Sequence, residues 1–147
     1  MKHKYFELSE LLRSDTALTK KIDNCPTWEI VDHLDELTQK ILDPLREAWG
    51  RPIRVTSGYR CDALNKAVGG APTSAHRNGY AADLQDWYGK TEELIAFAKE
   101  WLEKSGIWYD QLIRETNGSN RQRPWLHIGL YGSNGCQRRQ YLDLIKK

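Results

Sequence analysis

The chain has 147 residues, with 22 lysines and arginines against 20 aspartates and glutamates, which gives a formal net charge of +2. This length suits one domain with a substantial core, so we expect a single domain over residues 1–147. The near balance of charges and the 10% aromatic content exclude a disordered chain and argue against nucleic acid as a partner.

The N-terminal stretch MKHKYFELSELLRSD contains lysines but no apolar run behind them, so it does not read as a secretory signal. No apolar run elsewhere approaches the roughly 18 residues of a membrane span. Cys25, Cys61 and Cys136 are too few and too scattered for a disulfide framework or a CxxC zinc knuckle. We therefore expect a monomer without a membrane span, made in the cytoplasm.

Helical periodicity dominates the first third of the chain. A short helix is predicted from Leu8 to about Leu18, and a longer one follows Pro26, which suits a first turn. The apolar residues of the longer helix recur at three- and four-residue spacing: Ile30, Val31, Leu34, Leu37, Ile41, Leu42 and Leu45. Gly50 should end this helix, and Pro44 should kink or interrupt it near Asp43.

The pattern then changes to that of short strands and loops. Ile53–Thr56 alternates as a strand, and Val68–Gly79 is rich in glycine and other turn residues, which predicts a loop. Ala81–Gln85 reads as a second strand. A further helix should begin at Thr91, a good N-cap residue, and end at Gly106.

Two more strands are predicted at Tyr109–Arg114 and Trp125–Leu130, joined by a polar, turn-rich loop. The tail, Gln137–Lys147, is compatible with either a helix or an edge strand. Because helices come first and strands cluster later, we expect an α+β fold with a small antiparallel sheet packed with helices.

Two of the four histidines lie in unusual settings. His76 belongs to the glycine-rich loop, Asp83 follows seven residues later at the start of a strand, and His127 lies within another predicted strand. A loop that folds back beside its own strand would bring His76 to Asp83, and a neighbouring strand could supply His127. Two imidazoles and one carboxylate are a usual protein set for catalytic zinc. Alternatively each is an ordinary surface or core histidine, which we accept for His3 and His33.

Several motifs around these residues occur in a fixed order: Ser57-Gly58-Tyr59-Arg60, Leu64-Asn65 with Val68-Gly69-Gly70, SxHxxGxAxD from Ser74 to Asp83, and Trp125-x-His127. Together they resemble the D-Ala-D-Ala carboxypeptidase and L-alanyl-D-glutamate endopeptidase family of zinc peptidases. The fold of that family is shared with Hedgehog signalling domains. The resemblance extends from about Phe6 to Leu130, and it implies a zinc peptidase domain that cuts peptides of bacterial peptidoglycan.

Position by position, the resemblance implies that His76, Asp83 and His127 bind Zn²⁺ and that Arg60 holds a carboxylate of the substrate. A planar guanidinium can grip a carboxylate through two parallel charge-assisted hydrogen bonds. Outside this context, a solvated loop arginine would be the default interpretation. Ser74 resembles a family position that hydrogen-bonds substrate; alternatively it caps the loop.

The chain departs from one family pattern at the position of the general base. Many bacterial members carry an acidic residue three positions before the last histidine, and this chain has Pro124 there. The segment Asp110–Glu115 instead resembles the Hedgehog-type and phage-like arrangement, in which a glutamate ending the previous strand faces the metal across a hairpin. We therefore expect Glu115 to be the general base, with Asp110 as the alternative. Their offset of five residues predicts opposite faces of the strand.

Glu115 could also be an ordinary carboxylate at the end of a hairpin, paired with Arg114 or Arg123. With that alternative open, we expect zinc-dependent hydrolysis of peptidoglycan stem peptides, of the D-Ala-D-Ala carboxypeptidase or the L-Ala-D-Glu endopeptidase type. The missing secretory signal suits a phage or prophage lysis enzyme that acts on the cell wall after release or export. The alternatives are a non-catalytic, zinc-stabilised binding module of Hedgehog-like fold and an α+β domain without metal.

Overall fold

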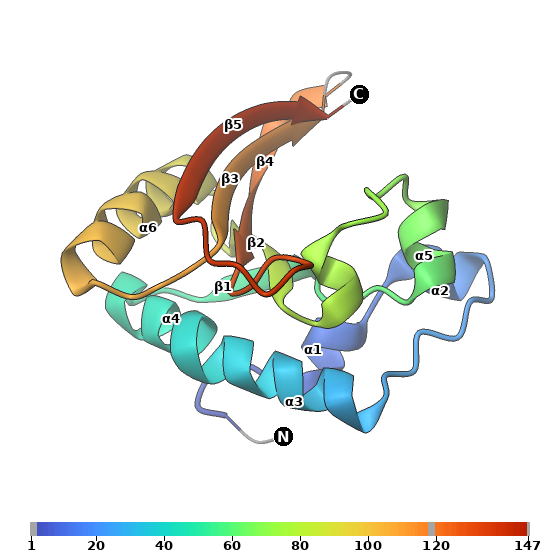
Figure 1. Cartoon of the computed structure of the whole chain (residues 1–147). Helices are drawn as coiled ribbons and strands as arrows, with labels where there is room; N and C mark the ends of the chain where they lie inside the picture. The colour runs from blue at the N-terminus through green and yellow to red at the C-terminus, as the bar shows by residue number, and fades with distance from the viewer. Residues whose placement is uncertain (1–2, 118–119, 147) are drawn as a thin grey trace.

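The computed structural model describes residues 3–117 and 120–146 and contains a curved sheet with helices packed around it (Figure 1). The sheet has the strand order β1-β2-β4-β3-β5. Its strands are β1 (Ile53–Ser57), β2 (Ala81–Asp86), β3 (Gln111–Asn117), β4 (Asn120–Gly129) and β5 (Gln140–Lys146). Neighbouring strands are antiparallel except for β3 and β5, which are parallel. The predicted α+β class with a small, mainly antiparallel sheet is therefore confirmed.

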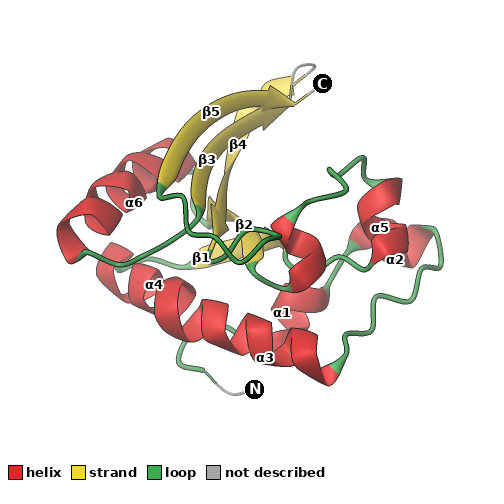
Figure 2. Cartoon of the chain, viewed as in Figure 1, coloured by secondary structure: helices red, strands yellow, loops and turns green. Residues whose placement is uncertain are grey.

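The helices lie at the sides of this sheet, and α3 and α4 together form one long rod (Figure 2). They are α1 (Leu8–Leu12), α2 (Asp15–Thr19), α3 (Trp28–Leu37), α4 (Asp43–Trp49), α5 (Asp62–Ala67) and α6 (Thr91–Ser105). A 3₁₀ turn, η2 (Ala75–Asn78), precedes β2. No helix within the described ranges has both the length and the apolar composition that crossing a membrane requires.

The long helix predicted after Pro26 contains a π-helical turn, η1 (Thr38–Leu42), between α3 and α4. Pro44 has no amide hydrogen and cannot donate to the carbonyl four residues earlier. The amide of Asp43 donates to the carbonyl of Thr38, five residues earlier, which gives the wider turn. The predicted interruption near Asp43 is confirmed, and Gly50 ends α4 with a φ of 78°.

Two predicted boundaries in the helical parts were wrong. The helix expected from Leu8 to Leu18 is split into α1 and α2, because Arg13 is extended and Ser14 caps α2 by accepting from the amide of Ala17. Thr91 is the first residue of α6 and not its cap; its hydroxyl accepts a hydrogen bond from the amide of Asp86.

The structure also contains elements that the sequence did not predict or left ambiguous. Helix α5 was not predicted, and it occupies the chain between the Arg60 motif and the glycine-rich loop. The predicted loop Val68–Gly79 contains the turn η2. The ambiguous tail forms the edge strand β5, which pairs with β3 in parallel.

The core lies between α3, α4, α6 and one face of the sheet. Its fully buried leucines and isoleucines come from these three helices, from the π-helical turn between α3 and α4, and from three strands: Leu34, Leu37, Ile41, Leu42, Leu45, Leu84, Leu94, Leu102, Leu112, Leu126 and Ile128. Strand residues alternate between the two faces of a sheet. The residues next to these core positions therefore point to the opposite face, where η2 lies beside β2.

Gly58 connects the core to that opposite face. A Cβ atom at this position would lie 2.3 Å from the carbonyl oxygen of Leu11 in α1. The amide of Tyr59 donates to that same carbonyl at 2.8 Å, and the Gly58 carbonyl contacts Nδ1 of His76 at 2.7 Å. The absent side chain thus lets the segment before Arg60 pass directly over α1.

We expect Gly58→Ala to lower the free energy of unfolding by about 1–3 kcal/mol, because the added methyl group overlaps backbone atoms that cannot move independently. Gly129→Ala is the matched control, since its Cβ would meet neighbours at 3.6 Å or more. Urea unfolding of both variants measures the effect. Equal stability of the two variants would show that the contact between Gly58 and α1 does not constrain the fold.

Candidate metal centre

Strand pairing brings two of the candidate ligands together. Asp83 on β2 lies directly opposite His127 on β4, and opposite residues in an antiparallel pair point to the same face. The turn η2 adds His76, whose ring meets that of His127 edge to face, with 5.0 Å between ring centroids. All three residues are buried.

One atom of each side chain converges on a common point. Oδ1 of Asp83 lies 3.2 Å from Nε2 of His76 and 3.1 Å from Nδ1 of His127, and these two nitrogens are 3.2 Å apart. Ligand atoms about 2.0–2.1 Å from a tetrahedral zinc ion are about 3.3 Å from one another. The spacing and the donor set of two imidazoles and a carboxylate therefore fit zinc, with a fourth position available.

Further contacts orient these ligand atoms. The Gly58 carbonyl can only accept a hydrogen bond, so Nδ1 of His76 carries the proton and Nε2 presents its lone pair to the cluster. The second oxygen of Asp83, Oδ2, accepts a hydrogen bond from Arg60 at 3.3 Å, which leaves Oδ1 facing the two histidines.

The surroundings also set the protonation states. Burial lowers the pKa of the His76 imidazole, an effect that Asp83 opposes and Arg60 reinforces. Burial alone would raise the pKa of Asp83, but His76 and His127 hold it well below its usual range. A neutral imidazole and an ionised carboxylate are the forms that bind a metal ion.

Arg60 lies beside the cluster and is buried, with 6% of its surface exposed. Its side chain donates to Ser57 at 3.0 Å, to Asn65 at 3.2 Å and to Asp83 at 3.3 Å. A guanidinium has five N–H groups, so these bonds leave two for a ligand. Arg60 is therefore fixed in position and still able to donate.

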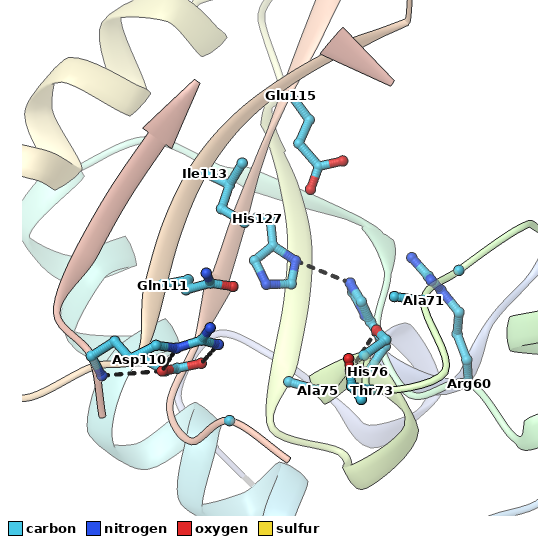
Figure 3. Close-up of a pocket in the computed structure, with 14 residues that line it drawn as sticks. Arg60, Ala71, Thr73, Ala75, His76, Asp110, Gln111, Ile113, Glu115 and His127 are labelled. Atoms are coloured by element: carbon cyan, nitrogen blue, oxygen red, sulfur yellow. Dashed lines mark hydrogen bonds and ion pairs between the residues drawn. The ribbon is translucent and has the colours of Figure 1, made fainter. Parts of the chain in front are cut away.

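The cluster opens into a cavity of about 230 Å³. His76, His127, Arg60 and Ser74 line it together with residues of β3 and of the segment between β4 and β5. Figure 3 shows His127 near the middle, Arg60 and Asp110 on opposite sides of the two histidines, and Glu115 farther along the strand. The space is several times that of one water molecule, about 30 Å³, so part of a peptide can enter.

Strand alternation directs Glu115 into this cavity. Ile113 pairs with His127 across β3 and β4, and Glu115, two residues on, lies on the same face. Figure 3 shows its carboxylate extending into the space beside the histidines. Glu115 thus lies at the wall of the same cavity as the two histidines.

Asp110 also lines the cavity, so the prediction that it faces away from Glu115 was wrong. It precedes the first residue of β3, and the alternation of the strand does not extend to it. Arg138 donates to both its oxygens at 2.8 Å, and the Arg138 amide adds a bond at 3.1 Å. Burial would raise the pKa of Asp110, but these hydrogen bonds lower it, which makes Asp110 a poor proton acceptor.

The remaining predicted residues are placed as follows. The Ser74 hydroxyl accepts from the His76 amide at 3.2 Å, and the residue also lines the cavity, so capping and substrate contact are both compatible with its position. His3 contacts Asp35, and His33 stacks on Tyr80, so neither belongs to the cluster.

Arg138 was missed as a cavity residue in the sequence analysis. It follows the last recognised motif and lies next to the ambiguous tail, and no local pattern distinguishes it from a solvated arginine.

A protein-family model described as Peptidase M15 matches residues 4–128, well over half of the chain. The matched range contains the three candidate ligands, Arg60 and Glu115. A search of curated proteins gave no match. The chain therefore belongs to the Peptidase M15 family, which confirms the predicted membership among the zinc D-Ala-D-Ala carboxypeptidase-like peptidases.

Proposed function

We propose that this protein is a zinc-dependent peptidase that hydrolyses peptide bonds in the stem peptides of bacterial peptidoglycan. The reaction would be of the D-Ala-D-Ala carboxypeptidase or the L-Ala-D-Glu endopeptidase type. The observation that carries this proposal is the convergence of His76, Asp83 and His127 at the wall of a cavity that also holds Glu115 and Arg60. Membership of a peptidase family supports it.

His76, Asp83 and His127 would hold the zinc ion, which when bound supplies a Lewis acid and makes water nucleophilic near neutral pH. Glu115 would take the proton of the attacking water and later deliver it to the leaving amine. Its position on the face of β3 shared with Ile113, next to His127, supports this role.

Arg60 would position the substrate by donating its two remaining N–H groups to a carboxylate. The bonds to Ser57, Asn65 and Asp83 fix its guanidinium before the substrate arrives, and such preorganisation reduces the entropy lost on binding. Ser74, at the cavity wall, would add a hydroxyl contact.

The second candidate is a zinc-stabilised binding module without turnover. A carboxylate directed into the cavity beside the cluster favours the enzyme, because a purely structural zinc site has no use for a base. A role in phage or prophage lysis stays a prediction.

We expect the purified protein to bind one zinc ion per chain after reconstitution. His76→Ala and Asp83→Asn should each weaken zinc binding by at least about 100-fold, since loss of a mere supporting contact already costs 10–100-fold. Competition with a chromophoric chelator measures the affinity, and His3→Ala, outside the cluster, is the control. Unchanged affinity in both ligand variants, or a wild-type protein that takes up no zinc, would contradict the assigned metal site.

Glu115→Gln should keep the zinc ion and the fold while hydrolysis falls by about 10²–10⁴-fold, because the amide cannot accept the proton. Release of soluble peptides from purified peptidoglycan, followed by mass spectrometry, measures the rate. Asp110→Asn is the comparison and should lose less. If Glu115→Gln cleaves at the wild-type rate and Asp110→Asn does not, Asp110 is the base.

Arg60→Lys should lower kcat/KM at least 10-fold for a peptide with a free carboxylate at the position Arg60 binds, because lysine keeps the charge but loses the planar fork. The same peptide with that carboxylate amidated should respond little to the substitution. An equal fall for both peptides would assign Arg60 a structural role only.

A further inference from the structure

A second arginine lies at the cavity, on the side away from Arg60. Arg138 belongs to the segment between β4 and β5 and lines the cavity together with His76 and His127. Its side chain is 49% exposed, whereas that of Arg60 is 7% exposed. Arg138 is therefore the more accessible of the two guanidinium groups at this cavity.

The partner of Arg138 is buried and fixes its orientation. Asp110 is 2% exposed and receives Nε and Nη2 of Arg138 at 2.8 Å each. This side-on pairing uses two of the five N–H groups, and both hydrogens of Nη1 and one of Nη2 remain. In the part of the chain that the structure describes, no other residue accepts from them. The free end of the guanidinium has the fork geometry that suits a carboxylate.

The surrounding backbone holds this pair in place. Gly132 permits close approach, because a Cβ there would lie 3.1 Å from Oδ2 of Asp110 and 3.4 Å from Nη2 of Arg138. The amide of Gln140 donates to the Asp110 carbonyl at 3.0 Å, which ties the segment to the start of β3. Arg139 adopts a φ of 52°, a conformation that residues other than glycine rarely take. The segment that carries Arg138 is therefore tied to the start of β3 beside the cavity.

We propose that Arg138, positioned by Asp110, is a specificity-determining residue that binds a second carboxylate of the peptide substrate, opposite the one assigned to Arg60. The inference rests on the proposed peptidase function. It defines the preferred substrate class as peptides with two acidic groups, one on each side of the bond-cleaving centre. Asp110, the partner of Arg138, and Arg60 lie on opposite sides of the two histidines (Figure 3), so a peptide held at both ends would cross the histidines.

The test uses a synthetic stem-type peptide with two free carboxylates and two derivatives, each with one carboxylate amidated. For the wild-type protein, amidation at the Arg138 side should raise KM by about 10–100-fold with little change in kcat, as expected for loss of a charge-assisted contact. Arg138→Gln should have a raised KM for the unmodified peptide and no longer distinguish it from that derivative. It should still distinguish the other derivative, which Arg60 recognises.

Two further variants separate positioning from a general effect on the fold. Asp110→Asn should lose part of the same discrimination, because Arg138 stays but is no longer held by a charged partner. Arg139→Gln is the matched control: this neighbouring arginine stacks over Trp108 at 4.7 Å and does not line the cavity. It should retain the wild-type pattern with all three peptides.

Calorimetric binding of the same peptides to the Glu115→Gln protein gives a readout without turnover. If the Glu115→Gln protein binds the unmodified peptide more tightly than the derivative amidated at the Arg138 side, but the wild-type protein cleaves none of the peptides, the proposed function is contradicted and the carboxylate site is supported. If Arg138→Gln changes KM equally for all three peptides, or for none, Arg138 only secures the segment to β3 and the inference is overturned. Should Arg138→Gln fail to fold, Arg138→Lys, which keeps the charge, replaces it.

Discussion

The mutual approach of Asp83, His76 and His127 is the constraint on which the rest of the site depends. Three polar ligand atoms lie buried within 3.1–3.2 Å of one another, and burial of such groups is costly unless each has a partner. Each ligand atom finds its partners among the other two, and neighbouring elements of the fold bring the three together. The register of β2 and β4 sets Asp83 against His127, and η2 supplies His76.

The same constraint couples the site to the core through a short series of contacts. The α1 carbonyl of Leu11 holds the chain at Gly58 and Tyr59, the Gly58 carbonyl fixes the ring of His76, and Arg60 binds the far oxygen of Asp83. Distortion at any of these points would move a ligand atom. The candidate metal centre is therefore built on backbone positions that the packing of α1 and β1 already determines.

Much of this arrangement could be predicted from the sequence because it is encoded locally. His76 and Asp83 lie within one turn-and-strand unit, and the kink near Pro44 follows from a missing amide hydrogen. His127 was a candidate third ligand from a neighbouring strand, and its position opposite Asp83 follows only from the strand register, which the local sequence does not encode.

What could not be predicted depends on contacts distant in sequence. Asp110 precedes β3, so its orientation is set by the ion pair with Arg138 and not by strand alternation. Arg138 in turn lies at the cavity because β5 pairs with β3 in parallel. This pairing places the segment that precedes β5 beside the start of β3. No periodicity in the tail carries this information.

X-ray absorption spectroscopy of the zinc-loaded protein tests the central claim most directly, that these three side chains form a zinc site with an open position. We predict a four-coordinate zinc ion with only nitrogen and oxygen neighbours at about 2.0–2.1 Å, two of them showing the multiple-scattering pattern of imidazole. A six-coordinate hydrated ion, sulfur neighbours from the free cysteines, or a spectrum unchanged in His127→Ala would contradict the account.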